Sequence, residues 1–117
     1  MTQGQVGALE LDDRRFAVRT EQVDGREYIR VTGEMDLSVI GLVDRVVERA
    51  EETEATRIVL DLDELEFVDA SGLRLLLHLR ERLLANGRRL RITRSASPQV
   101  RRVMELSGVG KLLPFED

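Results

Sequence analysis

The stretch Phe67-Val68-Asp69-Ala70-Ser71-Gly72-Leu73 decides how this chain folds, because it joins a strand pattern to a helix pattern. The apolar run within Arg57 to Leu62 predicts a buried strand before it. Leucines at helical spacing from Gly72 to Asn86 predict an amphipathic helix after it. Ser71 is therefore expected at or just before the first helical turn, where unpaired backbone N–H groups favour an anion. A hydroxyl at this place can cap the helix or carry a phosphate, and both hypotheses stay open.

The composition predicts one globular domain and excludes several classes of site. The chain has 117 residues, of which 42% are hydrophobic, so it can form a single core. A net charge of -4, interspersed charges and only 3% aromatic residues argue against a nucleic-acid surface. The lack of cysteine excludes disulfides, thiolate metal sites and cysteine nucleophiles. No membrane-spanning apolar run and no export signal occur, so we expect a cytoplasmic protein without direct membrane insertion.

Hydrophobic periodicity predicts the element order β-β-α-β-α-β-α. Residues 1–13 show no period and are expected to form a flexible N-terminal tail, followed by one domain over residues 14–117. Strands are predicted over residues 14–23, 27–32, 57–62 and 89–94, and helices over residues 39–52, 72–86 and 98–107. Residues 109–115 are expected to end as a short strand or an apolar tail. This pattern predicts an α/β sandwich with a mixed sheet of four to five strands and helices mainly on one face.

Turn and cap residues mark several of these boundaries. Asp24-Gly25 predicts a tight turn between the first two strands, and Gly33 is expected to end the second. Asp36 or Ser38 is a candidate cap for the first helix. Ser97 and Pro98 predict the start of the third helix, and Gly108 predicts its end.

The second helix carries more leucines than a simple surface helix needs. Leu75 and Leu79 widen its apolar face. They are expected either to complete the core between the sheet and a neighbouring helix or to line a face that binds a partner.

The predicted topology places a site beyond the carboxyl ends of the strands, where helices begin. The loops expected at this edge span residues 33–38, 66–71 and 95–98. They would bring Asp36, Asp69, Ser71 and Ser95 towards one surface.

The residues do not support an enzyme. His78 would lie roughly 10 Å along the helix axis from Ser71, at about 1.5 Å per residue, so a hydrogen bond between them is not expected. Asp36 and Asp69 at helix starts are typical of caps rather than of acid–base catalysts. The sequence has no phosphate-binding GxxxxGK loop and no metal-ligand spacing, so we expect no catalytic residues, no metal and no cofactor.

Three motifs in the right order resemble the STAS domain family, specifically the single-domain anti-anti-sigma factors, which are also called anti-sigma factor antagonists. Gly33-Glu34-Met35-Asp36 is similar to the family's Gly-Glu-hydrophobic-Asp motif. Residues 58–62 with 67–73 are similar to its central strand and signature turn. Ser97-Pro98-Gln99-Val100-Arg101-Arg102, with Leu106-Ser107-Gly108-Val109, is similar to its last helix.

This resemblance, which covers roughly residues 16–115, implies a STAS-like sandwich and a binding switch. The domain would bind an anti-sigma factor that is also a GHKL-type serine kinase, and so free a sigma factor. Phosphorylation in the signature turn would break the complex, and a PP2C-type phosphatase would reset it. The resemblance implies a monomer or weak dimer whose partner-binding residues are Asp36, Asp69, Ala70, Ser71, Gly72, Arg74 and Leu75.

Two positions depart from the family pattern. The phosphorylated serine of well-known members directly follows the aspartate, where this chain has Ala70, so Ser71 becomes the phosphorylation candidate. Val39-Ile40 stands where many members carry a Thr-Ala pair. An alternative within the family is the accessory STAS subunit of a lipid or anion transport complex at a membrane. The Ser-Pro-x-Val-Arg-Arg start of the third helix is more similar to the sigma-regulatory group.

Overall fold

The computed structural model describes residues 6–10 and 15–116, and describes side chains from residue 15. The strands are β1 (Val6–Glu10), β2 (Phe16–Val23), β3 (Arg26–Met35), β4 (Arg57–Asp61), β5 (Leu65–Val68) and β6 (Arg89–Ile92). The helices are α1 (Ile40–Glu51), α2 (Ala70–Ala85), α3 (Pro98–Ser107) and the short 3-10 helix η1 (Val109–Lys111).

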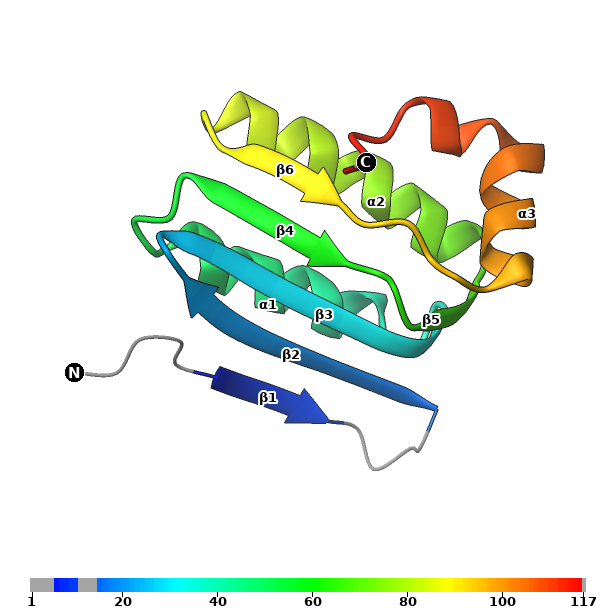
Figure 1. Cartoon of the computed structure of the whole chain (residues 1–117), viewed down its shortest axis with the longest axis horizontal. Helices are drawn as coiled ribbons and strands as arrows, with labels where there is room; N and C mark the ends of the chain where they lie inside the picture. The colour runs from blue at the N-terminus through cyan, green and yellow to red at the C-terminus, as the bar shows by residue number, and fades with distance from the viewer. Residues whose placement is uncertain (1–5, 11–14, 117) are drawn as a thin grey trace.

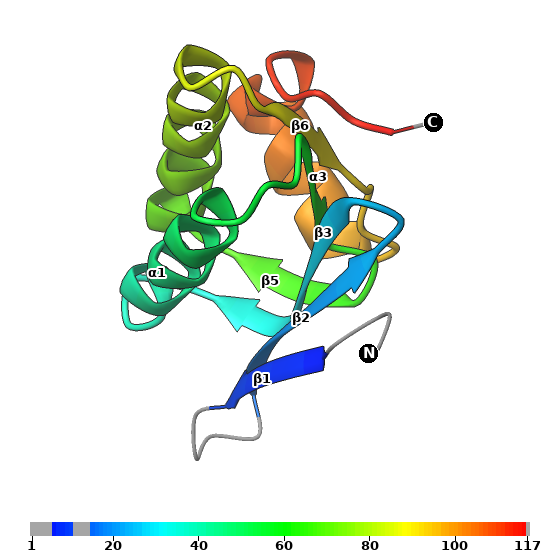
Figure 2. The same cartoon turned by 90° about the vertical axis from the view of Figure 1, so that its left-hand side faces the viewer.

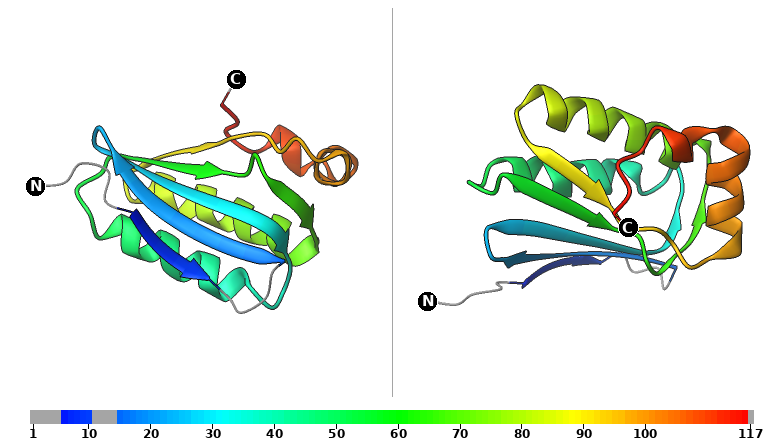
Figure 3. Two further views of the ribbon diagram at one scale, coloured as in Figure 1. Left: turned by 60° about the horizontal axis from the view of Figure 1, so that its bottom comes forward. Right: turned by 45° about the horizontal axis from the view of Figure 1, so that its top comes forward.

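The strands form one mixed sheet with helices on one face. Five strands follow the order β1-β2-β3-β4-β6, and β5 pairs with β3 off this path. β1, β2 and β3 pair antiparallel, whereas β3 pairs parallel with β4 and with β5, and β4 pairs parallel with β6. α1 and α2 lie side by side on one face of the sheet (Figures 1 and 2). α3 lies at the end of the sheet next to β5 (Figure 3), and the other face carries no α-helix of the described chain.

The predicted fold class is confirmed, but two strands were not foreseen. β1 falls within residues 1–13, which were predicted as a flexible tail, and it pairs along β2 from Val6 opposite Glu21 to Glu10 opposite Ala17. The rest of that predicted tail lies outside the described residues, and the domain boundary at residue 14 stays a prediction. β5 falls in the loop that was predicted to join strand and helix directly.

The sequence predicted that Gly33 ends the second strand, and this prediction is wrong. β3 continues past Gly33 but changes its pairing partner there. The strand pairs with β4 up to Arg30 and with β5 from Gly33, and its register shifts between Gly33 and Glu34. Gly33 has a φ of +90°, and a Cβ built there would lie 1.8 Å from the carbonyl oxygen of Arg15. A residue with a side chain cannot occupy this place, because it would need both the left-handed conformation and the space of the backbone of Arg15.

The other predicted turns and caps are confirmed. Asp24 and Gly25 have φ values of 51° and 76°, the left-handed pair that a tight hairpin turn requires. Ser97 accepts a hydrogen bond from the Val100 N–H at 3.4 Å and so caps α3. Gly108 ends α3 with a φ of 79°.

The core is aliphatic and lies between the sheet and the two helices α1 and α2. Leu75 and Leu79 are 8% and 0% exposed, so the interpretation of both as core residues is correct. After η1 the chain returns to the sheet edge, where Phe115 forms an isolated parallel bridge with Ile92. This single bridge takes the place of the short strand or tail expected near the C-terminus.

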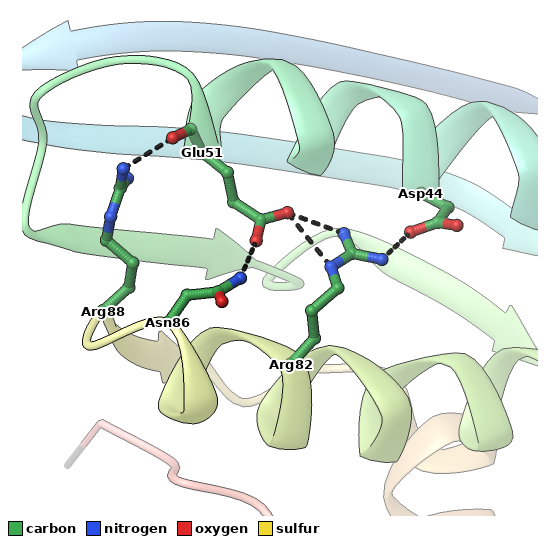
Figure 4. A network of polar contacts seen from close by, with 5 residues as sticks. All are labelled: Asp44, Glu51, Arg82, Asn86 and Arg88. Carbon is green, nitrogen blue, oxygen red and sulfur yellow. Dashed lines mark hydrogen bonds and ion pairs between the residues drawn. The ribbon is translucent and has the colours of Figure 1, made fainter.

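A partly buried polar network joins α1 to α2 (Figure 4). Arg82 donates to Asp44 at 2.7 Å and to Glu51 at 3.0 Å. Asn86 donates to the second carboxylate oxygen of Glu51 at 3.0 Å. Burial opposes the charge of Arg82, but its hydrogen bonds to the two carboxylates outweigh that cost and raise its pKa. The network ties the C-terminal part of α2 to α1.

Candidate functional site

Asp36 and Asp69 lie next to each other at the carboxyl ends of β3 and β5. Each directly follows one of two residues in register, Met35 and Val68. The Asp69 N–H donates to the Met35 carbonyl oxygen at 3.3 Å, which continues the ladder by one step. Both side chains are half-buried. The predicted convergence of these two carboxylates is therefore confirmed, with β5 rather than β4 as the strand that delivers Asp69.

Asp69, and not Ser71, caps α2. The Asp69 backbone is extended, and its Oδ1 accepts a hydrogen bond from the Gly72 N–H at 3.0 Å. Ser71 is the second residue of the helix, whose first residue is Ala70. The cap hypothesis for Ser71 is therefore wrong, because a residue with helical backbone cannot turn its hydroxyl back onto the N–H groups that follow.

Asp36 stabilises the turn before α1. Its Oδ1 accepts from the Ser38 N–H at 2.9 Å and from the Ser38 hydroxyl at 2.6 Å. The cap position of α1 is Val39, which makes no side-chain cap hydrogen bond. Neither Asp36 nor Ser38 is therefore the cap that the sequence predicted, because the cap position lies one residue after Ser38 and three residues after Asp36.

The Ser71 hydroxyl is half-buried and makes no hydrogen bond within the described part of the chain. It lies in the first turn of α2, where N–H groups lack helical partners and an added anion is favoured. Ala70 beside it is exposed, and Arg74 is exposed one helical turn further along. Ser71 therefore has a small residue before it and a cation one helical turn after it.

Two residues predicted to contact a partner serve the core instead. Gly72 is buried, and a Cβ there would lie 2.5 Å from Val68 Cγ2 and 3.0 Å from the Met35 carbonyl oxygen. Its role is to let α2 approach the ends of β3 and β5. Leu75 packs inside the core and leaves almost no surface for a partner.

Leu37 and Phe67 are exposed apolar residues that the sequence analysis did not single out. Leu37 is 69% exposed in the loop after Asp36, and Phe67 is 36% exposed at the end of β5. Apolar area bordered by polar groups is typical of surfaces that bind another protein.

Ser95 does not join this surface, contrary to expectation. It is 4% exposed, and its hydroxyl donates to the Leu65 carbonyl oxygen at 2.7 Å. Leu65 begins β5, whereas Asp69 follows the end of that strand. The unforeseen strand therefore lies between Ser95 and the carboxylates.

The site offers carboxylates, one free hydroxyl and apolar surface. Over residues 6–10 and 15–116, no cluster of three His, Cys, Asp or Glu side chains could hold a metal ion. No helix in these same ranges is long and apolar enough to cross a membrane. Docking of another protein is the chemistry that this combination supports.

The chain belongs to the STAS domain family, because the family described as "Mlab, STAS domain" matches residues 18–114. It is 28% identical over 101 residues to the anti-sigma F factor antagonist of Paenibacillus polymyxa, and the match covers 86% of each chain.

Solved structures with the same fold include further anti-sigma factor antagonists. The antagonist from Mycobacterium paratuberculosis superposes with a TM-score of 0.72 at 22% identity, over 95% of this chain and 85% of the other. SpoIIAA in its unphosphorylated form gives a TM-score of 0.64 at 24% identity, over 97% and 89% of the two chains. Its phosphorylated form gives 0.57 at 24% identity, over 97% and 92%.

Proposed function

We propose that this chain is an anti-sigma factor antagonist, which binds an anti-sigma factor in the cytoplasm and so frees a sigma factor. Its homologue with 28% identity bears that name and matches over most of both chains. The observation that carries the proposal is the partly exposed group Asp36, Asp69 and Ser71, with exposed Leu37 following Asp36 and exposed Phe67 in β5 before Asp69. An apolar area with a polar rim suits a regulated protein contact.

The finer part of the proposal is that the anti-sigma factor is a GHKL-type serine kinase that phosphorylates Ser71. Ser71 has the one unbonded hydroxyl of the signature turn, since Ala70 has none and Asp69 caps the helix. The SpoIIAA structures include a phosphorylated form, which shows that a homologous fold accepts such a group. A PP2C-type phosphatase would restore the free hydroxyl.

Phosphorylation would break the complex by charge rather than by unfolding. A phosphate adds about -1.5 to -2 charges at neutral pH. Asp36 and Asp69 lie next to the start of α2, so the docking surface would gain a third anionic group. A partner that had buried this surface would then have to desolvate charges that it does not pair.

The test compares two variants that each add one negative charge at the second residue of a helix. Ser71→Asp changes α2, and Gln99→Asp makes the matched change at the exposed second residue of α3. The anti-sigma factor is first identified by cross-linking and mass spectrometry from the native cytoplasm, and binding is then measured by calorimetry. We expect Ser71→Asp to weaken binding at least 100-fold and Gln99→Asp to change it less than threefold.

Two further outcomes distinguish binding of an anti-sigma factor from phosphorylation of Ser71. Intact mass after incubation of the wild-type chain with partner and ATP should rise by one phosphate, and Ser71→Ala should abolish that rise. A stable complex without added phosphate would reject Ser71 as the switch and keep the binding role. Recovery of a membrane permease complex, with no anti-sigma factor bound, would reject the proposed function itself.

A further inference from the structure

Three arginines form a row across the open face of the sheet. Arg26 of β3 pairs in register with Arg57 of β4, and Arg57 pairs in register with Arg89 of β6. Successive strand residues point to opposite faces. Ile29, Ile58 and Leu90 pack in the core below the helices, so the arginines of the row point to the face without helices.

The arginine row (Arg26, Arg57 and Arg89) borders a hollow of about 370 Å³. Arg91 lines the same hollow from the next outward position of β6, and Val59 and Phe115 form its apolar part. Glu116 is the single carboxylate among the lining residues. Four arginines and one carboxylate residue therefore line this space.

These four arginines have no partner in the described part of the structure. None of them makes an ion pair or a side-chain hydrogen bond there. Arg30 on the same face, by contrast, is held by Asp61 at 3.1 Å. Like charges directly opposite each other on neighbouring strands destabilise a sheet. The row thus costs stability unless an anion binds it.

We propose that this hollow binds a compact oligophosphate: a pyrophosphate or triphosphate group, free or as part of a nucleotide. The planar guanidinium fork matches phosphate oxygens in pairs. The row spans two strand spacings, roughly 9.6 Å, which is wider than one phosphate and fits a chain of two or three. The hollow is near the small end of ligand sites, which run from about 300 to 1,000 Å³, so it suits a small molecule rather than a nucleic acid.

We expect the site to contact the phosphate groups of its ligand rather than a nucleotide base. Phe115 is the aromatic ring in its lining, and the guanidinium of Arg94 already covers that ring at 4.3 Å. The hollow also lies far from the docking surface. Arg26 begins the ten-residue strand β3, whose last residue precedes Asp36, so the two sites are separated by roughly 30 Å. Oligophosphate binding is therefore independent of the proposed role of Ser71.

The test is calorimetric titration of the full chain with inorganic tripolyphosphate at low ionic strength. The row variant carries Arg26→Gln, Arg57→Gln and Arg89→Gln. The control variant carries Arg45→Gln, Arg49→Gln and Arg102→Gln, which removes three exposed charges from α1 and α3. We expect saturable binding to the wild type, at least tenfold weaker binding to the row variant and a change below threefold in the control.

Titrations with other ligands identify the source of the phosphates, and a single-residue variant provides a second test. Equal affinity for tripolyphosphate, ATP and GTP would assign the site to the phosphate chain alone, and tighter nucleotide binding that the row variant loses would assign it to a nucleotide. If the row variant does not fold, the single Arg91→Gln variant should still weaken binding at least threefold. Absent saturation, equal weakening by the control, or tighter binding of a polyglutamate peptide or DNA duplex would each overturn the proposal.

Discussion

Gly72 shows how one missing side chain positions the docking surface. The approach of α2 to β3 and β5 leaves 2.5 Å between Val68 Cγ2 and a Cβ at this residue. Gly72→Ala should therefore lower the free energy of unfolding by about 1 to 3 kcal/mol, because the added methyl forces α2 away from the sheet. Urea unfolding followed by circular dichroism measures this change. Gly41→Ala is the control in α1, where no atom lies within 4 Å, and it should be neutral or stabilise the fold by up to about 1 kcal/mol.

Glu27 gives the fold a pH dependence of known sign. Its side chain lies on the helix-covered face of β3 and the residue is 6% exposed. Burial raises the pKa of its carboxyl above 4.5, and a hydrogen bond with Gln22 offsets only part of that rise. The native state therefore keeps a proton that the unfolded state has lost, and stability falls as pH rises through this window.

Replacement of Glu27 by Gln should remove the loss of folding stability that occurs as the pH rises. We expect Glu27→Gln to unfold at higher urea than the wild type near neutral pH, and the difference should shrink below pH 4.5, where both states of the wild type are protonated. Glu48→Gln, at an exposed position of α1, should show no such pH-dependent gain. A constant difference across the pH range would contradict the assignment to Glu27.

At the scale of elements, α1 and α2 are joined through one arginine. The Arg82 side chain is 21% exposed and bonds to Asp44 and Glu51, whose side chains are 34% and 15% exposed. Arg82→Met should cost about 1.5 to 3 kcal/mol, because Glu51 is left partly buried without its charged partner. Chemical denaturation checks this value. Arg102→Met on exposed α3 should cost less than about 0.5 kcal/mol, and a similar cost in both variants would show that the network contributes nothing specific.

The elements that local chemistry specifies were predicted from the sequence. The left-handed pair Asp24-Gly25 and the start of α3 at Ser97 each need only residues close in the chain. β5 was missed because its buried positions, Leu65 and Val68, enclose two exposed residues and do not alternate. Its strand character comes from pairing with β3, a contact that a local pattern does not contain.

Only part of the site was predicted, because some of its features depend on contacts between residues far apart in the sequence. The topological rule placed Asp36 and Asp69 together, because both follow strands that end at one edge. The choice of cap between Asp69 and Ser71 depended on where α2 begins, and the Asp69 N–H bond to Met35 settles it. The arginine row also depends on register, since its members come from three strands far apart in sequence.

At the scale of the whole molecule, charge is separated although the chain carries a net charge of -4. Six arginines lie at outward positions of the sheet, namely Arg19, Arg26, Arg30, Arg57, Arg89 and Arg91. The carboxylates at the start of α1 and α2 lie at the far end of β3. One rigid sheet can therefore present an acidic docking surface and a basic anion site without interference between them.

A switch of this kind requires that new charge at Ser71 leaves the fold intact. The second residue of α2 lies in the positive end of the helix dipole, which stabilises an anion by roughly 0.3 to 1 kcal/mol, and the nearby Asp36 and Asp69 offset part of that gain. Ser71→Asp should therefore change the free energy of unfolding by less than about 1 kcal/mol while it abolishes docking. Backbone amide chemical shifts should change only around β5, the start of α2 and the Asp36 turn. Shifts spread through β4, β6 and α3 would mean that the charge acts by refolding, and the electrostatic account of the switch would fail.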